Sequence, residues 1–498
     1  MSNAVRVNKE AELTPYTNGY VRNDHAVPRR KTGVVTGFQI RQADRYFLML
    51  LSVGAVAKCF FSSAPSEIIQ PVVVLSILAF IPVGLLLKRD VSGIIINPAI
   101  IFCGTFLVVY GYSALNSYDA TVANLHMEQV MPTALWWACV GLAAFILGYL
   151  MPLGGKVSTL LPSFPQYDSD KKIQWFCWAS IIIALVRYAS FPLGISGLTS
   201  FLEGFDLLAV CLIALLGFNG DGPGHGIGSR KWHLPVAVVV ASIPGLLSGF
   251  RGLFMVPYIM AVLALYFASG RFPWKKVAVF GLFAYLIIFP ILGLYKVARQ
   301  QLGYEVLESV SYTVSELQLV DFYDFSGEQT DKLRDRYAVM PVFTTIVALT
   351  GEKVPYQDGS TYTLFLWNFI PRFLWKDKPV LNSFANTLPR QYGIINENDD
   401  KTSVGLGLLG ETWMNFGYPG LILIMVAFGV IYKCLFHWIL IRTKFNRFAC
   451  AVYLPILWQL SLQENVFVNN MGAIFKFLLL VWLLGHLPLS TQMRKRNV

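Results

Sequence analysis

The sequence predicts an all-α polytopic membrane protein with about twelve transmembrane helices and one large loop that contains short helices. Composition is the first observation behind this prediction. Hydrophobic residues make up 55% of the 498 residues, charged residues make up 14%, and the mean hydropathy of +0.54 lies far above the globular range. The second observation is that the apolar residues fall into separate runs of roughly 15 to 20, close to the length that a spanning helix needs.

The expected spans follow one another through short polar connections, except where the long loop interrupts them. We find no internal repeat between the two halves of the chain, which counts against a transporter built from inverted repeats. The chain divides into a tail, a first set of helices, the loop, a second set of helices and a second tail, at 1–45, 46–297, 298–418, 419–487 and 488–498. The expected spans are Tyr46–Phe61, Ile68–Leu87, Ile94–Tyr112, Pro132–Leu150, Ile173–Ala189, Phe205–Phe218, Leu234–Leu247, Leu253–Phe267, Val277–Leu294, Pro419–Phe436, Phe448–Leu462 and Met471–Leu484.

Basic residues set the expected orientation, because Lys and Arg concentrate in the cytoplasmic loops of membrane proteins. They occur in both tails and in every second short turn, which we therefore predict to be cytoplasmic. Both termini then lie inside and the long loop lies outside. The expected location is the inner membrane of a bacterium, with a periplasmic loop. This topology accounts for the net charge of +11 without a nucleic-acid partner.

The cysteine and histidine pattern indicates neither a disulfide framework nor a metal centre. All seven cysteines lie in or beside apolar runs, and none lies in the long loop. No Cys and His cluster has the spacing of a metal site, so we expect no metal and no other cofactor. Chemistry in this chain would therefore depend on ordinary ionisable side chains.

Cations on the predicted outer side are the first candidates for a binding site, because topology does not explain them. Arg251 lies in a tight glycine-flanked turn, and Lys296 and Arg299 share one face at the end of a predicted helix. Three further cations lie near the outer ends of predicted spans: Lys58, Arg187 and Lys476. Snorkelling toward the interface explains these three equally well.

The long loop concentrates its basic and aromatic residues between positions 367 and 379. Arg372 and Lys378 of this segment could bind a phosphate. The neighbouring aromatic residues are candidates for contact with lipid or with a sugar face: Tyr362, Trp367 and Trp375. The alternative is an interfacial aromatic belt with solvated charges.

A second cluster, Gly410 to Gly417, immediately precedes the expected Pro419 helix. It places the carboxylate of Glu411 at the predicted outer membrane surface, near several cations. Glu411 could orient those cations or act as a general base. An ordinary capping or salt-bridging glutamate is an equally good interpretation.

Together these segments resemble the Wzy-type polymerases of bacterial O-antigen and exopolysaccharide synthesis. The resemblance is strongest over about residues 359–420 and is architectural elsewhere. It implies an inner-membrane glycosyltransferase that joins oligosaccharide repeat units carried on undecaprenyl diphosphate and uses no nucleotide sugar. Its partners would be that lipid-linked oligosaccharide and the membrane lipids, and a chain-length-regulating co-polymerase is left open. The matching features are Gly359-Ser360, Ile370-Pro371-Arg372, Trp375, Lys378-Pro379, Gly410-Glu411, Asn415-Phe416-Gly417 and the Gly-Phe-Arg-Gly turn at Arg251.

Such a transfer needs a stabilised leaving diphosphate and a deprotonated acceptor hydroxyl. We expect Arg251 and Arg372 to contact the diphosphate, with Arg299 and Lys378 assisting, because cationic donors bind phosphate oxygens without a metal. Related O-antigen ligases place a histidine in the large periplasmic loop, but this loop has none, so their base cannot be carried over. The candidate bases, in order of preference, are Glu411, Asp377 and His126.

Three other functions stay open at the level of sequence. A ligase that transfers a finished glycan to another acceptor would use the same donor and the same arginines. A transporter or flippase of lipid-linked sugars would place charged residues near the middle of the membrane, whereas those of this chain gather at the predicted outer ends. A non-enzymatic assembly or sensor protein would leave Arg251 unexplained.

Overall fold

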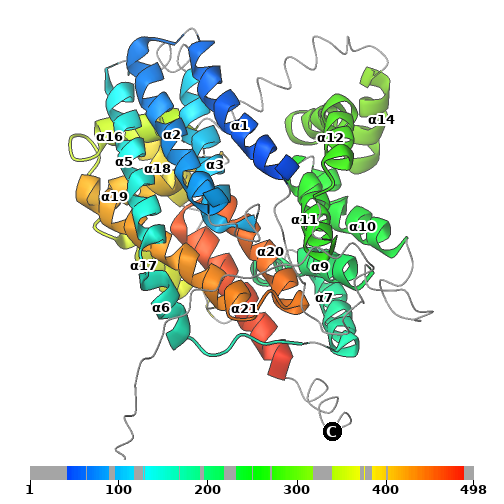
Figure 1. The fold of residues 1–498 in the computed structure, drawn as a ribbon. Coiled ribbons are helices and arrows are strands. Elements are labelled where there is room, and N and C mark those ends of the chain that lie inside the picture. Colours follow the sequence, from blue (N-terminus) through cyan, green and yellow to red (C-terminus); the bar gives the residue numbers. More distant parts are fainter. Residues whose placement is uncertain are drawn as a thin grey trace, which may run out of the picture. The chain divides into compact units, whose positions relative to one another are not determined.

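The computed structural model is helical, and no strand occurs among the residues that it describes (Figure 1). A single bridge between Thr350 and Val354 is the only β-type pairing in that part of the chain. All of the described residues belong to one compact unit. They are 42–62, 64–88, 96–116, 127, 129–167, 169–190, 196–217, 232–248, 251–269, 272–317, 339–368, 370, 375, 384–399 and 402–486.

Each of the expected apolar segments coincides with a helix, and further short helices occur within the stretch predicted as the long loop. The α-helices are α1 (Gln42–Phe60), α2 (Ser66–Lys88), α3 (Pro98–Phe106), α5 (Val130–Leu150), α6 (Leu153–Leu160), α7 (Asp170–Ser190), α8 (Ser196–Phe201), α9 (Phe205–Gly217), α10 (His233–Ser248), α11 (Arg251–Ser269), α12 (Trp274–Phe283), α13 (Phe289–Lys296), α14 (Val306–Leu317), α16 (Val339–Leu349), α17 (Ser360–Trp367), α18 (Phe384–Gln391), α19 (Gly407–Phe436), α20 (Arg447–Ser461) and α21 (Phe467–His486). Short π-helical segments extend or join some of them: η2 (Leu107–Tyr112), η3 (Ala284–Ile288), η4 (Val297–Gln301) and η6 (His437–Ile441).

The chain is a membrane protein with eight described helices that are long and apolar enough to cross a bilayer. The prediction of about twelve spans is not confirmed, because four of the expected segments fall short. Helices α9, α10 and α20 have 13, 16 and 15 residues, or about 20 to 24 Å at 1.5 Å per residue, against a hydrocarbon core of about 30 Å. Helix α1 is long enough at 19 residues, but its three charged residues, Asp44, Arg45 and Lys58, exclude it from the candidate spans. The eight candidates are Ser66–Leu85, Pro98–Asn116, Val130–Leu150, Asp170–Ser190, Gly252–Ser269, Val277–Arg299, Gly407–Ile441 and Phe467–His486.

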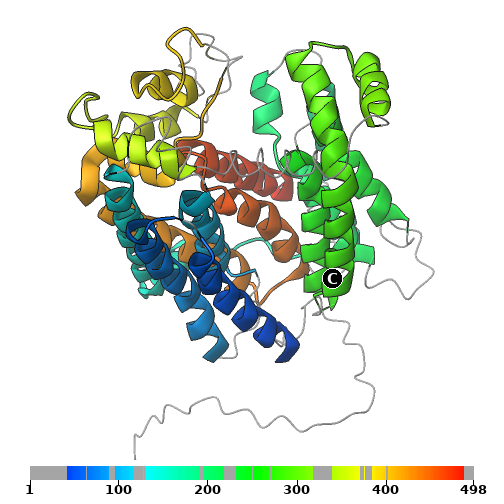
Figure 2. The same ribbon diagram turned by 90° about the horizontal axis from the view of Figure 1, so that it is seen from above.

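Two groups of helices meet at α20. In the first group α5 packs against α19 and α2, and α16 packs against α19. In the second group α9 packs against α7, α10 and α11. Helix α20 contacts α3 of the first group and α9 and α11 of the second, and Figure 2 shows α20 and α21 in orange and red between the two groups. Most residues of α9 and α20 are buried, so these two short helices are core elements rather than lipid-facing ones.

Helix α19 is two helices joined by a kink at Gly417, whose φ of 62° and ψ of −150° are open to glycine alone. The sequence predicted a helix from Pro419 onward with the Glu411 cluster before it. The structure places Glu411 inside the first of the two helices, so its side chain has a fixed position relative to the core.

Candidate functional site

A cavity of about 810 Å³ lies between the second helix group and helices α20 and α21. Most of its wall is apolar, because α10 and α11 present aliphatic and proline side chains to it and α21 presents Ile474 and Phe477. Charged side chains also belong to the wall. They come from the C-terminal part of α7, from the connection before α9, from the first turn of α9 and from η4. The cavity is therefore amphipathic, which is the form expected of a site for a lipid with a charged head.

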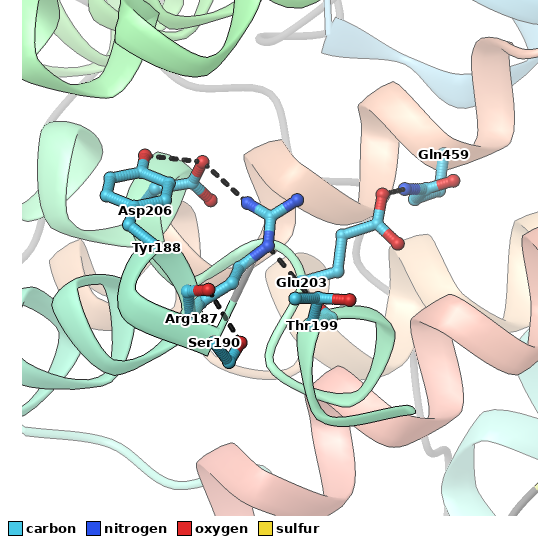
Figure 3. Close-up of polar contacts among 7 residues, drawn as sticks. All are labelled: Arg187, Tyr188, Ser190, Thr199, Glu203, Asp206 and Gln459. Carbon is cyan, nitrogen blue, oxygen red and sulfur yellow. Dashed lines mark hydrogen bonds and ion pairs between the residues drawn. The ribbon is translucent and has the colours of Figure 1, made fainter. Parts of the chain in front are cut away.

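An ion pair between α7 and α9 forms part of the charged wall (Figure 3). Arg187 Nη1 donates to Asp206 Oδ2 at 3.0 Å, and the Tyr188 hydroxyl donates to the same oxygen at 3.1 Å. Arg187 Nε also donates to the backbone carbonyl of Thr199 in α8 at 3.3 Å. Only 18% of the Arg187 side chain and 11% of the Asp206 side chain are exposed. One arginine thus ties α7 to both α8 and the start of α9.

Glu203 lies in the connection between α8 and α9 and also lines the cavity. Its Oε1 accepts a hydrogen bond from Gln459 Nε2 of α20 at 3.3 Å (Figure 3). No hydrogen bond or ion pair of its second carboxylate oxygen occurs among the described residues. Glu203 therefore has one oxygen held by a neutral amide and one oxygen left for another donor.

The predicted cation Arg299 lines the same cavity from η4. Its Nη1 donates to the carbonyl of Tyr304 at 2.7 Å, which closes the connection between η4 and α14. Helix α11 begins at Arg251, and Leu253 and Val256 of its first turns line the cavity. The Arg251 side chain lies outside the described residues, so the structure gives its backbone position only.

A second polar cluster joins the two ends of the segment that resembles the polymerases. Asn415 Oδ1 accepts from the Gly359 amide at 2.9 Å, and Asn415 Nδ2 donates to Thr361 Oγ1 at 2.8 Å. The amide of Gln357 donates to the carbonyl of Met414 at 2.9 Å. Residues separated by more than fifty positions therefore form one contact between α17 and the first part of α19.

Glu411 is buried at this contact, with 1% of its surface exposed. Its Oε2 accepts from the amide of Phe467, the first residue of α21, at 2.6 Å. Its Oε1 has no hydrogen-bond partner in the described part of the chain. Glu411 is not among the residues that line the cavity. It connects α19 to α21, and a role as base would need an acceptor hydroxyl to reach a sealed carboxyl group.

The three predicted aromatic contacts do not share one environment. Tyr362 lies parallel to the ring of Phe416, and its buried hydroxyl has no partner among the described side chains. Burial raises the pKa of this hydroxyl well above its usual range, and the charge of Glu411 raises it further. Trp367 is 42% exposed and meets Trp375 edge to face at 5.5 Å. Tyr362 thus has a buried hydroxyl that stays protonated, whereas the two tryptophans form a separate pair.

The remaining predicted site residues lie outside the described part of the chain: His126, Arg372, Asp377 and Lys378. Sequence reasoning did not select Glu203, Asp206 or Gln459. One signal was present, because Glu203 lies near the end of a predicted outer turn without Lys or Arg, Asp206 lies just after that turn, and the turn directly follows the helix that carries Arg187. Within the described residues, no three His, Cys, Asp or Glu side chains are close enough to hold a metal ion.

These features define a polytopic membrane protein with an amphipathic cavity among its helix ends. The model of the family called Domain of unknown function (DUF8712) matches residues 93–439, which is most of the chain, and the protein belongs to this family. The match includes the Arg187 ion pair, Glu203, Arg299 and Glu411, and it ends before α20 and α21. No curated protein and no solved structure matches the chain.

Proposed function

We propose that this protein is an inner-membrane glycosyltransferase that joins undecaprenyl-diphosphate-linked oligosaccharide units at the periplasmic face. The observation that carries the proposal is the amphipathic cavity. Its apolar wall suits a polyprenyl chain, Arg187 and Arg299 suit phosphate oxygens, and carboxylate, amide and indole groups such as those of Glu203, Gln459 and Trp458 suit a sugar.

The charged residues of the cavity support the proposed face of the membrane. They belong to the C-terminal end of α7, the start of α9 and the segment after α13, and all of these are helix ends that the charge pattern predicts to be periplasmic. A flippase would instead need polar groups along the whole path of the head group. Among the described cavity residues, Leu207, Ile243 and Phe477 continue the wall as apolar side chains.

A second pocket gives the lipid chain a place to lie. It has a volume of about 330 Å³, lies between α7, α9 and α10, and shares Tyr188 and Asp206 with the cavity. Its other lining residues are mostly apolar, and Trp178 and Leu185 are each 55% exposed on the helix surface. A polyprenyl chain could therefore enter from the surrounding bilayer while its head group lies near Arg187.

The proposed reaction needs a stabilised leaving group. The bond between the anomeric carbon and the diphosphate oxygen breaks, and its electron pair leaves with the diphosphate. We assign Arg299, which lines the cavity, to oppose that negative charge, and we assign Arg251, Arg372 and Lys378 to share this role. The acceptor oxygen forms the new bond to the same carbon. A ligase would perform the same step with a different acceptor.

Reconstitution tests the proposal directly. The lipid-linked oligosaccharide that accumulates in cells lacking the gene is extracted and supplied to the purified protein in proteoliposomes. Mass spectrometry should show products longer by whole repeat units. Arg299→Ala should lower the rate by about 10²- to 10³-fold, whereas Lys275→Ala, which removes an exposed cation at the opposite end of the same span, should have no effect.

Three results would contradict the proposal in different ways. Unchanged substrate with movement of the lipid between leaflets would indicate a flippase. Transfer to an added lipid or protein acceptor without repeat-unit extension would indicate a ligase. Equal rates for Arg299→Ala and the wild type would remove Arg299 from the diphosphate site.

A further inference from the structure

We propose that Glu203 is the catalytic base that takes the proton from the acceptor hydroxyl. This inference rests on the proposed transferase function. It is carried by the position of Glu203 in the cavity wall, by the hydrogen bond that fixes one of its oxygens, and by the second oxygen that no described residue engages.

Two side chains, Arg187 and Gln459, hold the segment that carries Glu203. Arg187 anchors it on both sides, because its guanidinium binds Thr199 four residues before Glu203 and Asp206 three residues after it. Gly204 follows with a φ of 89°, and a Cβ at this position would lie 3.3 Å from Phe477 of α21. Gln459 then fixes the carboxylate from α20. Such a preorganised group is what proton transfer in a transition state requires.

The other carboxylates near the cavity are less suited to this role. Asp206 Oδ2 already accepts from Arg187 and Tyr188, and its Oδ1 is buried without access to a substrate. Glu411 is 1% exposed and does not line the cavity. Among these three, Glu203 alone lines the cavity and makes no ion pair within the described part of the chain.

The proton balance of the proposed step is complete. The acceptor O–H bond breaks, the proton moves to the second oxygen of Glu203, and the freed electron pair forms the bond to the anomeric carbon. The bond between the anomeric carbon and the diphosphate oxygen breaks, and its electron pair leaves with the diphosphate. Glu203 then releases its proton to water, which returns the carboxylate to its starting state. No oxidant or metal is needed for this sequence.

The test compares Glu203→Gln with the wild type in proteoliposomes supplied with the extracted lipid-linked oligosaccharide. Glutamine keeps an oxygen for Gln459 but cannot take a proton, so kcat should fall by about 10²- to 10⁴-fold. Undecaprenyl diphosphate should still raise the thermal stability of the variant as much as it does for the wild type. Glu203→Asp should retain more activity than Glu203→Gln. Glu352→Gln, at an exposed turn, is the matched control.

Gln459→Leu separates chemistry from position. If Gln459 positions Glu203, its replacement by leucine should lower kcat in the otherwise wild-type protein. The same replacement should have no further effect on kcat in the Glu203→Gln background. Near-normal turnover of Glu203→Gln would overturn the inference while leaving the transferase function intact. Loss of undecaprenyl diphosphate binding in that variant would also overturn it, since Glu203 would then be a binding or structural group. A wild-type protein that extends no lipid-linked oligosaccharide would refute both proposals.

Discussion

The hydrogen bond between Glu411 and the first amide of α21 gives the most direct test of which contacts stabilise this structure. The first amides of a helix have no intrahelical acceptor, and the amide of Phe467 opens α21. Glu411 of α19 supplies the missing acceptor at 2.6 Å and places a carboxyl group at the positive end of the α21 dipole. A side chain of one helix thus caps another, and Glu411→Ala would leave the amide without this partner.

The magnitude follows from the loss of this single bond. A hydrogen bond to a buried carboxyl group contributes about 1 to 3 kcal/mol, and tenfold in an equilibrium constant corresponds to about 1.4 kcal/mol. Glu411→Ala should therefore speed hydrogen exchange at the start of α21 by roughly 5- to 150-fold if local opening governs exchange. Glu411→Gln should change exchange little, because its amide oxygen can still accept from Phe467.

Hydrogen exchange with mass spectrometry, on protein in nanodiscs, resolves peptides that contain Phe467. In the Glu411→Gln variant, the new NH₂ group would take the place of Oε1, which has no hydrogen-bond partner among the described residues. The glutamine variant should therefore fold as well as the wild type. Unchanged protection of these peptides in Glu411→Ala would refute the capping role. A glutamine variant that keeps wild-type exchange but loses all turnover would restore Glu411 as the base.

Three further predictions concern the fold and its orientation. Gly417→Ala should destabilise the protein by about 1 to 3 kcal/mol or more, because only glycine adopts its φ and ψ without strain, and a wild-type melting temperature would contradict this. Each of the variants Arg187→Met and Asp206→Asn should lower thermal stability, and the double variant should lose less stability than the sum of the two single losses. Strictly additive losses would show that the ion pair contributes nothing to stability. A cysteine that replaces Glu352 should react with an impermeant maleimide in intact spheroplasts, and a cysteine that replaces Lys156 should react only after lysis. The reverse pattern would invert the proposed topology.

The helices could be predicted from the sequence because apolar runs are a local property. The expected span 132–150, for example, corresponds to α5 at Val130–Leu150. Hydropathy does not distinguish lipid from protein as the neighbour of an apolar side chain, however. Helices α9 and α20 were predicted as spans on the same evidence, but the structure buries them among other helices.

The candidate site was only partly predictable, because its contacts join distant parts of the chain. The charge pattern selected Arg299 as a site residue, since a cation at a predicted outer helix end stands out against the topology. It drew attention to Arg187 for the same reason, but snorkelling explained Arg187 equally well. Its partner Asp206 depends on how α7 packs against α9, and the bond between Glu203 and Gln459 joins residues 256 positions apart. No local pattern specifies either contact. The polar cluster around Glu411 was recognised as a motif, but its structural connection to α21 follows from the packing alone.

The connection between α20 and α21 links the two clusters and makes their coupling testable. The amides of Gly407 and Leu408, at the start of α19, donate to the carbonyls of Glu464 and Gln463 at 3.1 Å each, and Glu411 binds Phe467 a few residues further on. Gln459, which holds Glu203, precedes this connection by one helical turn.

Loss of the Glu411 contact should therefore loosen the segment that orients the proposed base. In turnover assays, Glu411→Ala should lower kcat in the wild type but have little further effect in the Glu203→Gln background, because both changes act on the same proton transfer. Glu411→Gln should have little effect in either background. If Glu411→Ala lowers kcat by the same factor with and without Glu203, the two carboxylates act independently and the α20–α21 connection does not couple them.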